Sequence, residues 1–225
     1  MTPDVLRVSG PDTWSFLQSL LSQEVTTIVE GERRAALMLT PQGKVEVLLG
    51  VTRAGDDALL DTDAGWGERL LELLARYCIR TKVEMTIERA GEPDTPAEDA
   101  ARIAAGVPRL GRDLDDSVIP QEADLDLDAV SFTKGCFVGQ ELVCRIDSRG
   151  HVNRHLRLLE VDDAATAPVG GPLVHDGREV GVVTSAASGV ALGYVRREVE
   201  PGARVEFAGG SATVRIRPGV AESRS

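Results

Sequence analysis

Residues 134–141 have the sequence Lys134-Gly135-Cys136-Phe137-Val138-Gly139-Gln140-Glu141, and the rest of the chain is organised around them. A core strand would place apolar residues at most of these positions. Here the segment holds two glycines, a lysine, a thiol, an amide and a carboxylate. Because glycine loses more backbone entropy on folding than any other residue, Gly135 and Gly139 indicate a positive φ or a close approach of the backbone to something bound. We therefore expect a loop whose conformation serves function.

The residues after this loop favour a short helix. Residues 140–147 are expected to form two turns, with Leu142, Val143 and Ile146 facing inward. Cys136 then lies just ahead of a helix N-terminus, where backbone N–H groups and the Lys134 cation would both favour the thiolate. The thiolate is the nucleophilic and metal-binding form of cysteine. A buried, inert thiol is the alternative that the spacing leaves open.

The composition restricts the class of protein. The chain has 225 residues, is 42% hydrophobic and 27% charged, and carries a formal net charge of -11. This charge argues against a surface that coats nucleic acid. The longest apolar runs, such as residues 35–39, are far shorter than a membrane helix requires. Charged residues and Pro3 interrupt the region where a secretory signal would be apolar, so we expect a cytoplasmic protein with no membrane span and no direct nucleic-acid contact.

The cysteines also limit the possible chemistry. There are three, Cys78, Cys136 and Cys144, and no C-x-x-C motif. An odd number without such a motif argues against a disulfide framework and against a self-sufficient zinc site. Cys78 continues the apolar face of an expected helix at residues 70–78 and is interpreted as a packing residue. A metal bound through Cys136 would need ligands from elsewhere.

The first half of the chain predicts a mixture of helices and mainly antiparallel strands. A serine, a proline and an acid at residues 9–12 predict the start of a helix that ends near Gln23. Alternating apolar residues separated by turn signals predict strands at residues 5–8, 35–40, 44–52, 57–61 and 82–88. Residues 91–99, rich in proline and acids, are expected to be an exposed linker, followed by a short helix at residues 100–105.

The second half predicts a small all-β domain. Short β-prone runs at residues 156–161, 180–184, 191–195, 204–207 and 211–217 are separated by glycine-containing turns, a pattern typical of a β-barrel or sandwich. We place the domain boundary at residue 150, giving an α+β domain over 1–150, a β-domain over 151–219 and a tail over 220–225.

Two charged clusters flank the loop. Residues 113–128 hold seven acids, but an EF-hand needs a glycine within its loop and this run has none after Gly111, which disfavours a calcium site. The other cluster is basic and comprises Arg145, Arg149, His151, Arg154, His155 and Arg157. Solvated arginines on a strand are the usual explanation for such a run. A cluster beside a reactive loop is also suited to hold a polycarboxylate or phosphate.

Several of these residues carry a family resemblance. The chain resembles the YgfZ-type branch of the folate-binding YgfZ/GcvT proteins, most specifically across residues 102–157. The matching segments are residues 102–108, 119–122 and 131–141, then Arg145, residues 149–150 and Arg154, and more weakly the hairpin at residues 41–44. The resemblance implies a GcvT-like mixed α/β folate-binding-type domain followed by a C-terminal antiparallel β-barrel. Only about a dozen residues fill the interval before Arg102, so the family's middle region is shortened here.

The resemblance implies a tetrahydrofolate-binding protein that supports assembly or repair of iron-sulfur clusters in client enzymes, including enzymes that modify transfer RNA. Its partners would be iron-sulfur assembly proteins, the client enzymes and a folate-like small molecule. Such a protein is more an accessory factor than an enzyme. Cys136 would ligate or transfer iron-sulfur species, with Lys134 lowering its pKa. One thiol cannot hold a cluster, so partners must complete the coordination.

The remaining site residues are assigned from the same resemblance. Gly135 and Gly139 would shape the loop. Gln140 and Glu141 would orient it or hydrogen-bond a pterin-like ring, and Arg145 would neutralise an anionic ligand. Glu122 is a candidate for the same cavity, and a structural salt bridge is the alternative role for Glu141.

Two other functional classes stay open. The related aminomethyltransferases transfer a one-carbon unit to tetrahydrofolate, but they usually have glutamate where Ala104 stands and lack the cysteine of the motif. A one-carbon enzyme needs a carboxylate to steer protons, and no residue near Ala104 offers one. A non-catalytic interaction scaffold, in which the motif serves packing alone, is the third possibility.

Overall fold

The computed structural model describes residues 1–220, and these form two compact units. The first comprises residues 1–94, 115–120 and 125–149, and the second comprises residues 95–114, 121–124 and, within the described part of the chain, 150–220. The chain passes between the two units several times, the last time at residue 150. The division into domains at residue 150 stays a prediction. The expected tail, apart from Val220, lies outside the described residues.

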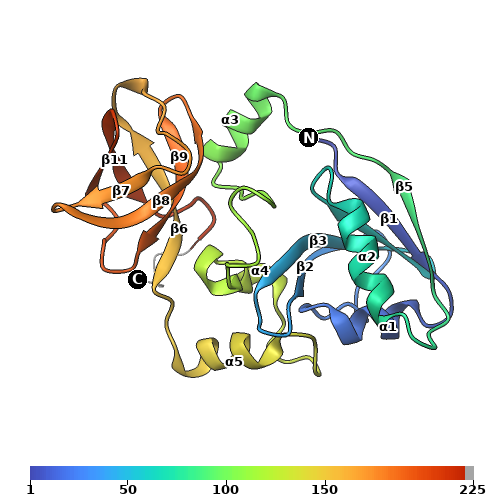
Figure 1. Ribbon diagram of the computed structural model, residues 1–225. Helices are drawn as coiled ribbons and strands as arrows, with labels where there is room; N and C mark the ends of the chain where they lie inside the picture. The colour runs from blue at the N-terminus through green and yellow to red at the C-terminus, as the bar shows by residue number, and fades with distance from the viewer. Residues whose placement is uncertain (221–225) are drawn as a thin grey trace. The chain divides into compact units, whose positions relative to one another are not determined.

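The first unit is built on a five-stranded antiparallel sheet with the strand order β2-β3-β4-β1-β5 (Figure 1). Its strands are β1 (Asp4–Ser9), β2 (Arg33–Leu39), β3 (Val45–Ala54), β4 (Asp57–Thr62) and β5 (Glu84–Arg89). Alternate residues of β1 and β4 are buried, which is the period that a half-buried strand requires. The strands lie within two residues of the positions predicted from alternation.

Two amphipathic helices lie against this sheet, α1 (Thr13–Leu20) and α2 (Gly67–Tyr77) (Figure 1). The buried residues of α1 include Phe16, Leu17 and Leu20, which share one face at helical spacing. The unit also contains α4 (Asp126–Ala129) and α5 (Gln140–Arg149), between which the motif loop lies. The expected helix after the loop is therefore present and extends two residues beyond the predicted end.

The second unit begins with α3 (Pro96–Ala104), whose first residues fall inside the stretch expected to be a linker. Thr95 accepts a hydrogen bond from the backbone of Glu98, and the Glu98 side chain accepts one from the backbone of Thr95. This capping box, with Pro96 in the first turn, starts the helix earlier than the apolar spacing suggested. Short 3-10 turns follow at η1 (Pro120–Ala123) and η2 (Asp162–Ala164).

The rest of the second unit is a closed six-stranded antiparallel barrel with the order β10-β11-β6-β9-β8-β7. Its strands are β6 (Arg154–Val161), β7 (Pro172–His175), β8 (Arg178–Ala187), β9 (Val190–Arg196), β10 (Arg204–Phe207) and β11 (Gly210–Arg215). Strand β7 was not predicted, and it closes the barrel by pairing with β10 through Glu206 and Val174. The predicted α+β fold with a C-terminal antiparallel barrel is confirmed, and the alternative of a sandwich is excluded.

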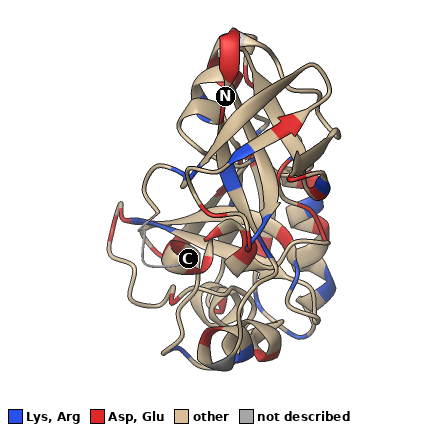
Figure 2. Cartoon of the chain, turned by 90° about the vertical axis from the view of Figure 1, so that its left-hand side faces the viewer, with Lys and Arg blue, Asp and Glu red and all other residues tan. Residues whose placement is uncertain are grey.

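Charged residues are interspersed along the ribbon, and acidic residues outnumber basic ones by 36 to 25 over the sequence (Figure 2). Among residues 1–220, the structure has no helix of sufficient length and apolar character to cross a membrane.

Candidate functional site

Lys134 anchors the motif loop to the end of α1. Its Nζ atom donates hydrogen bonds to the carbonyl oxygens of Gln18 at 2.7 Å, Leu21 at 2.6 Å and Gln23 at 3.1 Å. The last carbonyls of a helix lack intrahelical partners and carry partial negative charge, so a buried ammonium group satisfies them and complements the helix dipole. Burial lowers the pKa of Lys134 to about 8, with Glu24 opposing the shift, so the ammonium form persists at pH 7.

The residues just before Lys134 dock on the same part of the chain. Ser22, which is fully buried, donates its hydroxyl to the carbonyl of Ala129 and accepts from the backbone N–H of Leu37. The backbone of Ser131 donates to the carbonyl of Ser22 at 2.9 Å. Residues 129–134 are thus held against the segment that links α1 to β2, and the loop starts from a fixed position.

Gly139 fixes the other end of the loop. Its φ is +79°, and a Cβ atom there would lie 2.5 Å from the carbonyl oxygen of Thr40 and 3.0 Å from the Cα of Gly43. The loop therefore packs closely against the β2–β3 hairpin, and only glycine fits. Gly135 shows neither feature, because it has no positive φ and an added Cβ would meet nothing within 4 Å. The conformational expectation thus holds for Gly139 and not for Gly135.

Cys136 lies between these two anchors and is exposed to solvent. Its neighbour Phe137 is buried, with the Lys134 ammonium 5.5 Å from the ring centroid. The other two cysteines, Cys78 and Cys144, are only partly exposed. A buried, inert thiol is thereby excluded for Cys136. All three protons of Lys134 are donated to backbone carbonyls, so the hydrogen bonds give Lys134 a positioning role, and its effect on the Cys136 thiol stays a prediction.

The predicted residues of α5 begin four positions after Cys136, and two of them are exposed. Glu141 and Arg145 make an ion pair one helical turn apart, with their side chains 84% and 64% exposed. Exposed pairs of this kind contribute little to stability, so both groups are available to a ligand. Gln140 is partly buried at the start of the helix. Lys134, Gly135, Cys136, Gly139, Gln140, Glu141 and Arg145 thus all belong to one contiguous part of the first unit.

Glu122, the remaining predicted residue, belongs to the second unit and is paired there. Its two carboxylate oxygens accept hydrogen bonds from Arg154 at 3.0 and 3.2 Å. The Arg154 guanidinium also lies 4.5 Å from the ring centroid of Tyr194. Burial raises the pKa of Tyr194, whose hydroxyl donates to the carbonyl of Asp113 at 2.9 Å. Glu122 is therefore part of a packed polar network.

Asp113 is the centre of a second network that the sequence did not indicate. Its side chain is fully buried and accepts from Arg102 at 2.8 Å, from the backbone of Arg109 at 3.0 Å and from Thr184. Arg102 is equally enclosed and also donates to Ser185. Asp124 and Asp126 are likewise buried, so several members of the acidic run are core groups. Their burial depends on residues distant in sequence, which is why local spacing could not reveal it.

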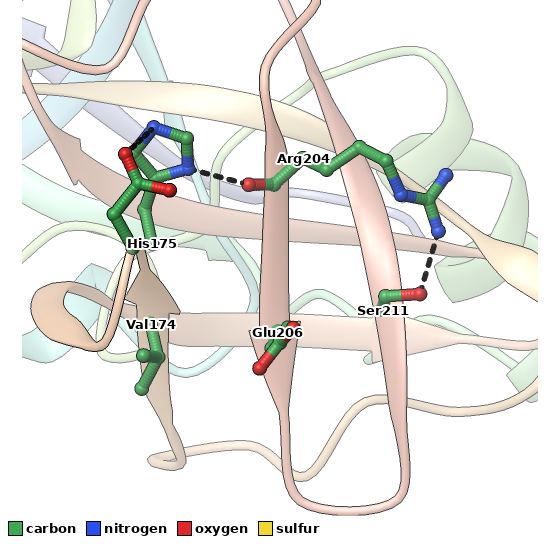
Figure 3. Close-up of a pocket in the computed structure, with 6 residues that line it drawn as sticks. Val174, His175, Arg204, Glu206 and Ser211 are labelled. Carbon is green, nitrogen blue, oxygen red and sulfur yellow. Dashed lines mark hydrogen bonds and ion pairs between the residues drawn. The ribbon is translucent and has the colours of Figure 1, made fainter.

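A polar hollow lies between β7 and β10 on the barrel (Figure 3). It encloses about 370 Å³ and is lined by Val174, His175, Asp176, Arg204, Glu206 and Ser211. Its polar groups bind one another: His175 contacts the carbonyl of Arg204 at 2.7 Å, and Arg204 donates to Ser211 at 2.7 Å. Because these polar groups are bonded to one another, we assign no chemical role to the hollow.

The described residues contain no cluster of three or more histidine, cysteine, aspartate or glutamate side chains arranged to hold a metal ion.

Comparison with known proteins relates both parts of the chain to one group. Residues 154–221 match the CAF17 C-terminal β-barrel domain. The chain is 33% identical to the tRNA-modifying protein YgfZ of Yersinia pestis over 60% of this chain and 42% of that protein. It is 24% identical to the mitochondrial iron-sulfur cluster assembly factor IBA57 homolog of Pyricularia oryzae over 77% of this chain and 59% of that protein. The chain thus spans about half the length of these relatives.

A solved structure matches nearly the whole chain. The glycine cleavage system aminomethyltransferase T of Bartonella henselae aligns with a TM-score of 0.86, covering 97% of this chain and 84% of its own. The sequence identity is 18%, so this likeness concerns the fold alone.

Proposed function

We propose that this chain, as a member of the YgfZ/GcvT family, supports assembly or repair of iron-sulfur clusters in client enzymes through the thiol of Cys136. The observation that carries the proposal is an exposed cysteine on a loop anchored at both ends. Lys134 anchors the loop on one side with three hydrogen bonds, and Gly139 packs against the β2–β3 hairpin on the other. A fixed, accessible sulfur is suited to meet a metal centre on another protein.

In this proposal, Cys136 acts as a ligand to an iron of the cluster. The thiol loses its proton, and the sulfur then donates an electron pair to one iron of an incoming cluster. Iron-sulfur clusters commonly require four ligands, so the client, an assembly protein or a small thiol supplies the rest. Incomplete ligation by this chain favours transfer, because the cluster leaves without breaking a full set of bonds to it.

Tetrahydrofolate is the small molecule that we propose for the same protein. A pterin ring needs amide and carboxylate partners and its glutamate tail needs a cation, and Gln140, Glu141 and Arg145 offer these groups. Glu122 belongs to the second unit, where it is paired with Arg154, and its role in folate binding stays a separate prediction. Bound tetrahydrofolate would supply a carrier of one-carbon units, while the chain's own residues would bind and orient it.

The proposal is tested by cluster transfer between purified proteins. The wild-type chain, Cys136→Ser and Cys144→Ser are each mixed anaerobically with a cluster-loaded assembly protein and an apo client enzyme. We expect Cys136→Ser to lose the acceleration of client loading and Cys144→Ser to retain it. Equal acceleration by all three proteins would contradict the role of Cys136.

An aminomethyltransferase is the competing function, favoured by the 25% sequence identity to the aminomethyltransferase of Prochlorococcus marinus over 85% of this chain and 51% of that protein. The substitution Cys136→Ala distinguishes the aminomethyltransferase from the cluster-assembly function. Transfer of a methylene unit to tetrahydrofolate that is undiminished in Cys136→Ala would support the enzyme. A scaffold, the third class, predicts that neither Cys136→Ala nor Lys134→Ala alters the activity of cluster enzymes in cells.

A further inference from the structure

The basic residues of β6 face two different sides of the barrel wall. Leu159 and Val161 belong to the apolar core of the barrel. Because alternate side chains of a strand face the same side, His155 and Arg157 point toward that interior at the start of the strand. Arg154 faces the other side, where it pairs with Glu122. The basic cluster, for which the sequence left both solvated arginines and an anion-binding role open, is therefore divided between the two sides of β6.

Arg157 is buried, and none of the described residues makes a direct hydrogen bond or close ion pair with its guanidinium. The residue is only 6% exposed. Burial lowers the pKa of Arg157 and the charge of Arg217 adds to this effect, while the carboxylates of Asp124 and Glu200 oppose it. Arginine keeps its charge in proteins, so a buried guanidinium normally has a carboxylate, phosphate or carbonyl partner. Among the described residues, no direct partner of this kind is present.

Two buried nitrogens of the second unit lack hydrogen-bond partners among the described residues. They are Nδ1 of His155 and Nε of Arg217. The carboxylate of Asp124 lies near all three basic residues. It accepts a hydrogen bond from Arg217 at 3.3 Å, and its charge acts on both His155 and Arg157. The other nitrogens of Arg217 donate to the carbonyls of Gly106 and Ala123, which holds its side chain in position.

We propose that His155, Arg157 and Arg217 form a binding site for a small oxyanion or carboxylate group at this end of the barrel. Such a ligand has the acceptor oxygens that the two arginines require, and its charge offsets that of Arg157. In the tautomer with its proton on Nδ1, His155 donates to the same ligand. A water molecule would satisfy the geometry without offsetting the charge. The proposal does not depend on Cys136 or on cluster transfer.

The test is calorimetric titration of the full chain with inorganic phosphate and, separately, with glutarate, at an ionic strength held constant with chloride. We expect one site per chain. Removing a hydrogen-bonded charge should raise the dissociation constant by at least about tenfold in Arg157→Met. Arg215→Met is the matched control, since Arg215 lies on the neighbouring strand, is half exposed and pairs with Glu160. Binding of phosphate alone indicates an inorganic oxyanion, and binding of glutarate alone indicates a carboxylate ligand.

Either of two results would overturn the proposal: no binding of either probe by the wild-type chain, or equal binding by wild type and Arg157→Met. Should the variant fail to fold, the wild-type chain still gives the answer by NMR. The side-chain signals of Arg157 and His155 must then shift on addition of the bound probe, and signals that stay fixed at saturating concentrations exclude the site.

Discussion

The Nζ atom of Lys134 donates a 2.6 Å hydrogen bond to the carbonyl oxygen of Leu21, 113 residues earlier in the chain. This contact joins the motif loop to the first helix. It gives a structural reason for a lysine two residues before the exposed cysteine, because an ammonium group is a compact donor with three protons for three converging carbonyls.

Replacing Lys134 by methionine should loosen the loop. The substitution leaves three carbonyl oxygens without their donor, and we expect a loss of about 2–3 kcal/mol in the free energy of unfolding of the first unit. Urea denaturation followed by hydrogen exchange measures the loss. Lys44→Met is the control, because Lys44 donates to a single carbonyl, that of Ser117. Equal losses in the two variants would contradict the anchoring role.

The two motif glycines should respond differently to alanine. Gly139→Ala places a Cβ against the carbonyl of Thr40 at a positive φ and should destabilise the first unit by about 2 kcal/mol or more. Gly135→Ala meets open space and should change stability by less than about 0.5 kcal/mol. Thermal or urea unfolding of both variants checks the contrast. A neutral Gly139→Ala would mean that the loop does not pack on the hairpin as described.

Arg102 should be a major stabilising residue of the second unit. Arg102→Ala leaves the fully buried carboxylate of Asp113 unpaired, a change that typically costs about 3–5 kcal/mol. Arg112→Ala is the matched control, since Arg112 is exposed and pairs only at the surface with Asp99, where about 1 kcal/mol or less is expected. Hydrogen exchange of the barrel amides measures the loss of stability in each of the two variants. Similar protection in both variants would refute the assignment.

His155 should make the second unit sensitive to mild acid. Burial, and then the charge of Arg157, lowers the pKa of His155 below 6.5. Between the folded pKa and 6.5 the unfolded chain binds more protons, so the stability contributed by neutral His155 above pH 6.5 is lost as the pH falls through the folded pKa. The difference in unfolding free energy between wild type and His155→Gln should therefore shrink on acidification. A difference independent of pH would contradict this expectation.

Local sequence patterns were sufficient for most of the fold. Alternation and turn residues located the sheet of the first unit and five of the six barrel strands. Strand β7 was missed because four residues are too few to display alternation, and its pairing with β10 is fixed by barrel closure. The start of α3 was missed although its capping box is visible at Thr95 and Glu98, because proline and acids suggested a linker.

The site was less predictable, since its contacts join residues far apart in the chain. Spacing identified Cys136 as an unusual residue but left its burial open. The partners of Lys134 lie more than a hundred residues away, and no local pattern indicates them. The same holds for Arg157, whose burial follows from the inward face of β6 in a closed barrel.

If the exposed sulfur of Cys136 acts on iron-sulfur clusters of other proteins, cluster-dependent enzymes in the cell depend on it. This dependence is measured as the specific activity of such an enzyme in cells whose own copy of this protein is replaced by Cys136→Ala or by Cys144→Ala. We predict reduced activity with Cys136→Ala and normal activity with Cys144→Ala, at equal amounts of both variants. Normal activity with Cys136→Ala would contradict it.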